Sequence, residues 1–257
     1  EAWHWYNDHV GAKRCPVVDT WWQTETGGIM IAPIAFITPT KPTYATLPLP
    51  GIQPVLMDER RNEIEDNQVV GSLCIKFPWP GIARTIWGDH QRYKDTYFSA
   101  FPGKYFTGDG ALRDEVGYYR ITGRIDDVVI VSGHNLGTAP IEDAINEHPA
   151  VAESAIVGFP HDIKGNALYG YVTLKETGEV RNKENLANEI NQYITDHIGP
   201  IAKLDKIQFV ASLPKTRSGK IMRRILRKIA EGDYSNFGDT STLLNPEVIE
   251  DIKGGRV

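Results

Sequence analysis

The chain has 257 residues, of which 41% are hydrophobic and 24% are charged, a composition typical of a folded globular protein. Its formal net charge of −5 argues against an extended nucleic-acid or anionic-membrane surface. The two cysteines, Cys15 and Cys74, show no CxxC spacing, which argues against a disulfide framework or a zinc site. The chain shows neither an apolar signal-peptide core nor a run of 18 apolar residues, so we expect a cytoplasmic protein without a membrane span.

The first half of the chain is predicted to be β-rich. Short apolar runs, several of them next to charged or glycine-containing turns, indicate strands. These runs cover residues 15–22, 55–58, 69–77, 105–107 and 118–122. The last two runs are separated by a predicted hairpin loop at residues 113–117. Repeated prolines between residues 31 and 54 predict an irregular segment there.

The second half is predicted to alternate between helices and strands. A helix begins near Pro140 and stops at Pro149, because proline fits the first turn of a helix but not its interior. Further helices are expected at residues 183–198 and 221–230, and strands at residues 155–159, 169–174 and 207–211. The last helix is amphipathic, and solvated cations are the simplest interpretation of its polar face. That face carries Lys220, Arg223, Arg224, Arg227 and Lys228.

A composition shift at residues 125–127 predicts a domain boundary. The fold class is therefore expected to be α+β, with a β-rich part at residues 1–125 and a small α/β domain with a central sheet at residues 126–257.

The segment LPKTRSGKIM at residues 213–222 is the strongest local signal for chemistry. Lys220 ends a Thr-Arg-Ser-Gly turn and opens the last predicted helix. Such a flexible loop can bring an ammonium group to carboxylate or phosphate oxygens. The alternative is a solvated basic loop in front of a surface helix.

A second polar segment, DTWWQTETGG, follows an apolar run and ends in a glycine pair. Its hydroxyl and amide groups can grip a nucleotide sugar or a phosphate. The candidate residues are Asp19, Thr20, Trp21, Trp22, Gln23 and Thr24. Core packing is the alternative for both tryptophans.

Asp109 and Arg124 complete the candidate nucleotide site. Asp109 lies between two glycines, where a carboxylate can accept both hydroxyls of a ribose, or it is an ordinary turn residue. Arg124 lies in GRIDD and can contact a ribose or a phosphate in a bidentate manner, or it forms a surface ion pair with a neighbouring aspartate.

These segments, together with GDHQRYKDTYF, ITGRIDDVVIVSGH and TRSGKIMRRILRKIA, resemble the AMP-forming acetyl-CoA synthetases of the adenylate-forming superfamily. The resemblance implies that residues 1–125 are the end of a large domain with a distorted antiparallel barrel, followed by a small mobile domain. It also implies a ligase that uses ATP with Mg²⁺ and CoA. Acetate would first give acetyl-AMP and pyrophosphate; the small domain would then rotate, and CoA would displace AMP.

The resemblance assigns roles to individual residues. Residues 19–24, Asp109, Arg124 and Asn135 would bind ATP or AMP, Lys220 would catalyse the first step, and Trp22 would limit the acyl pocket to short acids. Asp126 would be the hinge, and acetylation or deacetylation of Lys220 would regulate the first step. CoA would meet Ser132, Gly133 and Thr195, while backbone carbonyls of Asn146, His148 and Val151 would hold a metal ion. His148 itself is more simply interpreted as a helix-end histidine.

Three departures from the family pattern leave alternatives open. The Ser/Thr/Gly-rich phosphate loop has no counterpart in these residues, so we expect a fragment that is inactive by itself. Asn135 replaces the usual arginine, and Thr195 stands where a basic residue often meets CoA. The alternatives are a non-catalytic nucleotide-binding lid module, or an acyl-adenylating enzyme with a different short-chain acid or acceptor.

Overall fold

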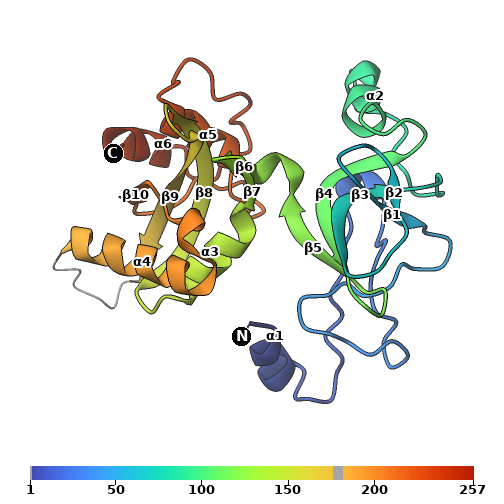
Figure 1. Ribbon diagram of the computed structural model, residues 1–257. Coiled ribbons are helices and arrows are strands. Elements are labelled where there is room, and N and C mark those ends of the chain that lie inside the picture. The colour runs from blue at the N-terminus through green and yellow to red at the C-terminus, as the bar shows by residue number, and fades with distance from the viewer. Residues whose placement is uncertain (1, 176–181) are drawn as a thin grey trace. The chain divides into compact units, whose positions relative to one another are not determined.

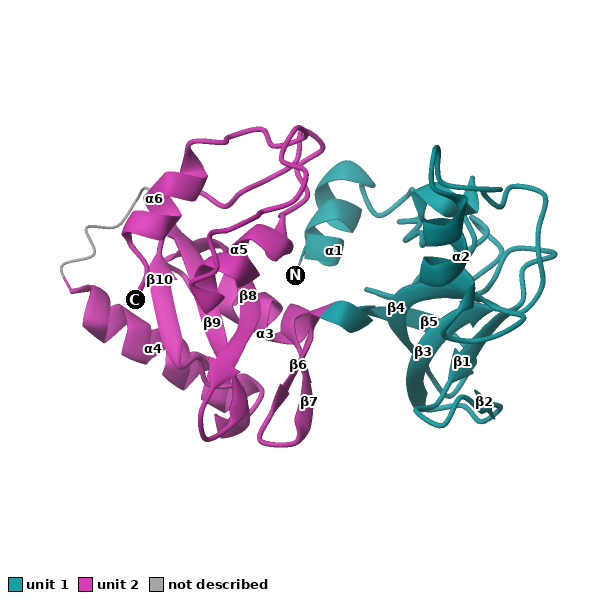
Figure 2. Cartoon of the chain, turned by 90° about the horizontal axis from the view of Figure 1, so that it is seen from above, with its two compact units in different colours: residues 1–126 teal, residues 127–257 magenta. Residues whose placement is uncertain are grey.

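The computed structural model describes residues 2–175 and 182–257, and it divides the chain into two compact units (Figure 2). Unit 1 covers Glu1–Asp126 and unit 2 covers Asp127–Val257. The sequence predicts a domain boundary between residues 125 and 126. Rotation about Asp126 stays a prediction.

Unit 1 is built on a five-stranded antiparallel sheet with the order β2-β1-β3-β4-β5 (Figure 1). The strands are β1 Pro54–Met57, β2 Glu63–Ile64, β3 Val69–Ile75, β4 Tyr105–Arg113 and β5 Tyr119–Arg124. One face packs against residues that follow the segment DTWWQTETGG, including Met30 and Ile31. Among the described residues the edge strands β2 and β5 do not pair with each other, so the sheet is open where a distorted barrel was expected.

The helical segments of unit 1 are α1 Ala2–Trp5, η1 Tyr6–Val10, η2 Thr24–Thr26 and α2 His90–Phe98. Helix α2 begins where the Asp89 carboxylate accepts a hydrogen bond from the Arg92 amide, at 3.0 Å. Its Tyr97 ring stacks on Tyr105 of β4, with ring centroids 5.3 Å apart. The prediction of a strand at residues 15–22 is wrong, because only an isolated bridge between Trp21 and Ile31 forms there.

Unit 2 has a sheet with the order β10-β9-β6-β7, and β8 pairs with β9. The strands are β6 Val128–Val131, β7 His134–Gly137, β8 Val151–His161, β9 Gly165–Leu174 and β10 Lys206–Phe209. Strand β9 is parallel to β10 and antiparallel to β6 and β8. The remaining elements are η3 Ile125–Asp127, which spans the unit boundary, α3 Thr138–Glu147, α4 Lys183–His197, η4 Pro200–Ala202, α5 Arg223–Glu231 and α6 Val248–Gly254.

Alternation along β9 gives unit 2 two hydrophobic cores. Tyr169 and Tyr171 pack with α5 and α6, whereas Leu168 and Val172 pack with α3 and α4. Because successive side chains of a strand point to opposite faces, the helices cover both sides of the sheet (Figure 1). The α+β fold class and the central sheet of the second half are confirmed. No helix in the described part of the chain is long and apolar enough to cross a membrane.

Candidate functional site

Asp109 is the centre of a buried polar cluster in unit 1. It lies within β4, so its interpretation as a turn residue is wrong, and it is only 7% exposed. One carboxylate oxygen, Oδ2, accepts hydrogen bonds from Trp21 Nε1 at 3.0 Å and from Gln23 Nε2 at 2.9 Å. The other oxygen, Oδ1, lies 3.5 Å from Arg124 Nη1. The fold thus brings together four residues that the sequence marks as nucleotide-binding.

The electrostatic state of Asp109 reflects a balance between burial and these donors. Burial raises the pKa of the carboxyl group, because the charged form loses water, while the bonds from Trp21 and Gln23 and the charge of Arg124 lower it. A buried carboxylate with few surrounding waters makes strong charge-assisted hydrogen bonds. This is the property that recognition of a pair of ligand hydroxyl groups requires.

The neighbours of Asp109 are themselves fixed. Gln23 also donates from Nε2 to the Thr107 carbonyl at 2.8 Å, and its Oε1 accepts a bond from the Tyr105 hydroxyl at 2.9 Å. These two bonds determine which way the Gln23 amide faces. Trp21 belongs to the hydrophobic core as well, so the core interpretation and the polar role both hold for it.

The Arg124 side chain passes close to Gly108 on its way to this cluster. Its Nη1 donates to the Thr107 carbonyl at 3.2 Å, and its Nε donates to Asp126 Oδ1 at 2.9 Å. Gly108 has a φ of +72°, and a Cβ atom there would lie 2.7 Å from Arg124 Nη2. A side chain at residue 108 would therefore push the guanidinium away. The predicted ion pair with a neighbouring aspartate exists alongside the contact to Asp109.

A cavity of about 110 Å³ adjoins the cluster. Its lining includes Gln23, Arg124 and two residues that the sequence analysis missed, Glu25 and Tyr97. The Tyr97 hydroxyl donates to Glu25 Oε1. The pKa of Tyr97 is raised, mainly by burial of its hydroxyl and secondly by the Glu25 carboxylate. Glu25 lies two residues after Gln23, so the motif DTWWQTETGG could have pointed to it. Tyr97 lies in GDHQRYKDTYF, one of the segments that carry the family resemblance, but the sequence analysis predicts no helix there and gives this residue no role.

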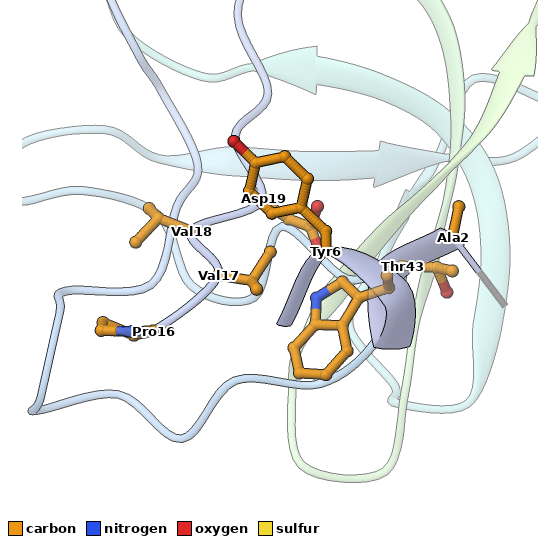
Figure 3. Close-up of a pocket in the computed structure, with 8 residues that line it drawn as sticks. Ala2, Tyr6, Pro16, Val17, Val18, Asp19 and Thr43 are labelled. Carbon is orange, nitrogen blue, oxygen red and sulfur yellow. The ribbon is translucent and has the colours of Figure 1, made fainter. Parts of the chain in front are cut away.

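The other residues of this segment lie elsewhere. Asp19 lines a separate pocket with Tyr6, Val17 and Thr43 (Figure 3). Burial raises the pKa of Asp19, while the Trp3 side chain and the Thr43 backbone lower it. Thr20 and Thr24 are exposed, and Trp22 is 57% exposed. The nucleotide role of Asp19, Thr20 and Thr24 and the acyl-pocket role of Trp22 stay predictions.

Lys220 lies in unit 2 on a hairpin that backbone hydrogen bonds close, and the flexibility expected of this loop stays a prediction. The Thr216 amide donates to the Lys220 carbonyl at 2.8 Å, and the Lys220 amide donates to Thr216 Oγ1 at 3.1 Å. A backbone bridge between Lys215 and Ile221 closes the turn. The Lys220 side chain is exposed, and the described residues offer its ammonium group no ion pair.

The residues expected to meet CoA lie on two elements of unit 2. Ser132 and Gly133 form the exposed turn between β6 and β7, with φ values of 49° and 82°. Asn135 follows on β7 and is exposed. Thr195 lies on α4, and its hydroxyl donates to the Asn191 carbonyl at 2.8 Å, so this hydroxyl is engaged within its own helix. The CoA-binding assignment stays a prediction.

The predicted metal-binding carbonyls lie near the junction of α3 and β8: Asn146 is in α3, His148 follows it and Val151 opens β8. The His148 carbonyl accepts a bond from the Val151 amide at 3.0 Å. The His148 ring accepts one from the Ala150 amide at 3.3 Å, which fits a helix-end histidine. The Asn146 side chain accepts a bond from Ser154 at 2.9 Å. Within residues 2–175 and 182–257 no group of three or more His, Cys, Asp or Glu residues could hold a metal ion, and the carbonyl site stays a prediction.

Comparison with known families matches both units. Residues 1–87 match the family model "AMP-binding enzyme", and residues 140–220 match "AMP-binding enzyme C-terminal domain". Lys220 is the last residue of the second match, whereas Asp109 and Arg124 lie between the two matches.

Individual relatives agree with these matches. The acetyl-coenzyme A synthetase of Parvibaculum lavamentivorans is 58% identical over 256 residues, which are 100% of this chain and 39% of that protein. The acetyl-coenzyme A synthetase of Syntrophobacter fumaroxidans is 58% identical over 98% of this chain and 38% of its own length. The chain therefore spans about two fifths of the length of the curated relatives it matches.

Solved structures show the same relationship. An ATP-bound RpMatB-BxBclM chimera has a TM-score of 0.73 and 28% identity, covering 85% of this chain and 42% of that one. The anthranilate CoA ligase AuaEII in complex with anthranoyl-AMP has a TM-score of 0.75 and 25% identity, covering 91% of this chain and 43% of that one. Together with the two family models and the full-span identity to the curated relatives, these similarities show that the chain belongs to the AMP-binding enzymes.

Proposed function

We propose that the chain is part of an AMP-forming acetate–CoA ligase, which makes acetyl-CoA from acetate, ATP and CoA through acetyl-AMP. The observation that carries the proposal is the buried Asp109 carboxylate, held by Trp21, Gln23 and Arg124. Similarity to curated acetyl-coenzyme A synthetases supports the substrate class.

In this proposal Asp109 accepts the two ribose hydroxyl groups of the nucleotide. Arg124 holds the Asp109 carboxylate in its charged form and adds a donor toward ribose or phosphate. Because burial strengthens hydrogen bonds to a carboxylate, the same arrangement that raises the pKa of Asp109 increases its value as a hydroxyl acceptor.

Lys220 supplies positive charge between the acetate carboxylate and the α-phosphate in the first half-reaction. A cation that is placed only in the transition state lowers the barrier without tightening ground-state binding. Mg²⁺ would accompany ATP, since this ion prefers phosphate oxygens and water with one or two carboxylates. Trp22 would limit the acid to two or three carbons because of its volume. Acetylation of Lys220 would remove its charge and stop this step.

A second candidate is an acyl-adenylating enzyme with a different acceptor. Two observations favour it: the Thr195 hydroxyl is engaged with Asn191, and Asn135 provides no positive charge near the nucleotide phosphates, where the family usually has an arginine. Ser132 and Gly133 leave an exposed turn at which CoA would bind under the first proposal.

The test is to assay the full-length enzyme for acetate-dependent ATP–pyrophosphate exchange and for CoA-dependent release of AMP. Both activities support the ligase. Exchange without AMP release on CoA addition supports the second candidate, and no exchange with any short acid supports a nucleotide-binding module. The isolated 257 residues are expected to give no exchange, since they contain no phosphate loop of the family type.

A further inference from the structure

The first turn of α5 carries an unfavourable concentration of positive charge. Arg223 and Arg224 open the helix three residues after Lys220, and the first turn itself contains no acidic residue and no side-chain cap. Cations at a helix N-terminus oppose the helix dipole. A local conflict of this kind marks a place where the fold uses these side chains for another purpose.

Arg223 is held by a buried carboxylate on another helix. Its Nε lies 3.3 Å from Glu142 Oε1, and its Nη2 contacts Glu142 Oε2, so the pairing is bidentate. Glu142 is 7% exposed and also accepts a bond from the Ile156 amide at 2.8 Å. The pair thus ties the start of α5 to α3 and to β8. A planar guanidinium fork bound in this way fixes direction as well as distance.

Arg223 also reaches the first residue of unit 2. Its Nε lies 3.9 Å from Asp127 Oδ2, and Arg227 Nη2 lies 3.4 Å from Asp127 Oδ1. Arg223 and Arg227 are four residues apart and share one face of α5. The helix that follows the Lys220 hairpin is therefore clamped to the residue next to the predicted hinge, Asp126.

The last residue of unit 1, Asp126, is also a carboxylate that pairs with an arginine, and it directly precedes Asp127 in the chain. Asp126 accepts a bond from Arg124, which also lies next to Asp109. Adjacent carboxylates are thus held by arginines of their own units.

We propose that Arg223 is a positioning residue, which acts with Glu142 and Asp127 to lock the Lys220 hairpin to the hinge-proximal end of unit 2. The inference rests on the proposed role of Lys220 in adenylation. Without Arg223 the hairpin keeps its own backbone bonds but loses its fixed direction relative to Asp127. A misplacement of roughly 1 Å at a reacting group can lower the rate by about 10².

The test compares four variants of the full-length enzyme: Arg223→Gln, Arg224→Gln, Lys220→Ala and the double variant Arg223→Gln/Lys220→Ala. Arg224→Gln is the matched control, because it removes the same charge one residue away, where the guanidinium donates to the backbone carbonyls of residues 237 and 239. Both half-reactions are measured: acetyl-AMP formation, and thioester formation from supplied acetyl-AMP and CoA.

We expect Arg223→Gln to slow acetyl-AMP formation by tenfold to about 10² and to change thioester formation by no more than a few-fold. In the Lys220→Ala background it should cause no further loss, because a positioning residue acts only through the group it positions. Arg224→Gln should stay close to wild type, and amide exchange in residues 216–222 should increase in Arg223→Gln only.

Additive losses in the double variant, or equal losses in both half-reactions, would overturn the inference while leaving the role of Lys220 in place. Wild-type adenylation by Lys220→Ala would instead overturn the proposed function itself. Arg223→Gln leaves the Glu142 charge buried, so a variant that fails to fold is replaced by Glu142→Gln/Arg223→Gln, in which the pair is neutral. The same comparison then applies.

Discussion

The two residues with the central roles in the proposed function, Asp109 and Lys220, lie in opposite environments. Asp109 is buried in unit 1, and its carboxylate has two hydrogen-bond donors and a guanidinium. Lys220 is exposed in unit 2 on a hairpin that holds only its backbone. The comparison shows two ways to place a charged group. One is to bury it among hydrogen-bond donors, and the other is to leave it exposed to solvent; which one suits a residue depends on the step in which its charge acts.

A binding residue gains from being surrounded, since it must meet the same ligand groups throughout the reaction. A residue that acts in only one step gains from staying exposed until a conformational change moves it into the active site. While it is exposed, the fold does not bear the free-energy cost of burying its charge. The predictions below test this contrast between the buried Asp109 site, called the prepared site, and the exposed Lys220 charge.

The largest effect is expected from Lys220→Ala in the full-length enzyme. Acetyl-AMP formation should fall by about 10²–10³, the usual loss when one transition-state donor is removed. Thioester formation from acetyl-AMP and CoA should change by no more than a few-fold. Arg217→Ala is the control, since Arg217 is exposed on the same hairpin. Equal losses in both half-reactions would mean that Lys220 supports the fold or a common ligand.

Asp109→Asn should weaken nucleotide binding next most strongly. A hydrogen bond to a charged group contributes about 1.5–3 kcal/mol, so AMP affinity should fall by roughly 10- to 100-fold. Calorimetric titration of the full-length protein with AMP measures the change. Asp66→Asn, at an exposed position, is the control for loss of a surface carboxylate. An unchanged affinity would assign Asp109 to the core of unit 1 only.

The same substitution should alter the pH dependence of stability. Burial raises the folded-state pKa of Asp109 above its ordinary value of 3.8, so ionisation favours the unfolded state. Wild-type stability should therefore decrease relative to Asp109→Asn as the pH rises from about 3.8 through the folded-state pKa. Denaturant unfolding of both proteins at pH 3.5 and about pH 7 checks this sign. A wild-type stability that rises relative to Asp109→Asn between these two pH values would contradict it.

The contrast between the two residues also explains what the sequence could predict. Lys220, Asp109 and Arg124 are candidate site residues in the sequence because each stands in a short motif with chemistry of its own. Helices α3, α4 and α5 were found because their apolar residues repeat at helical spacing. Both kinds of signal lie within a short stretch of residues, so they can be recognised from one sequence without knowledge of tertiary contacts.

What the sequence did not predict depends on contacts between distant segments. Trp21 and Asp109 are 88 residues apart, and nothing near Trp21 indicates that its indole donates to this carboxylate. Helix α2 has few apolar residues at helical spacing and is held by aromatic contacts with β4. Residues 15–22 are apolar enough for a strand but pack as an irregular segment, because tertiary contacts override propensity there.

Trp22→Gly should change the choice of acid in the full-length enzyme. If the indole limits the acyl pocket, its removal should shift preference toward butyrate and valerate, by roughly 1–3 kcal/mol for each methylene accommodated. Trp87→Gly is the control, since Trp87 is 97% exposed. The ratio of kcat/KM values for acetate and butyrate is the measurement. An unchanged ratio in a folded Trp22→Gly variant would remove Trp22 from the acyl pocket.

The smallest expected effect is that of Gly108→Ala, and comparison with Gly103→Ala separates the cost of backbone strain from the effect of the contact with Arg124. Gly108 and Gly103 have φ values of +72° and +79°, so alanine at either position should cost about 1–2 kcal/mol of unfolding free energy. Only at residue 108 would the new Cβ meet Arg124, since at residue 103 no described atom beyond the neighbouring residues lies within 4 Å of the new Cβ. Gly108→Ala should therefore also weaken AMP binding by a few-fold, whereas Gly103→Ala should not. Denaturant midpoints and AMP titrations of both variants decide the matter: equal affinities would show that Arg124 can move without loss, and that the prepared site depends on Asp109, Trp21 and Gln23.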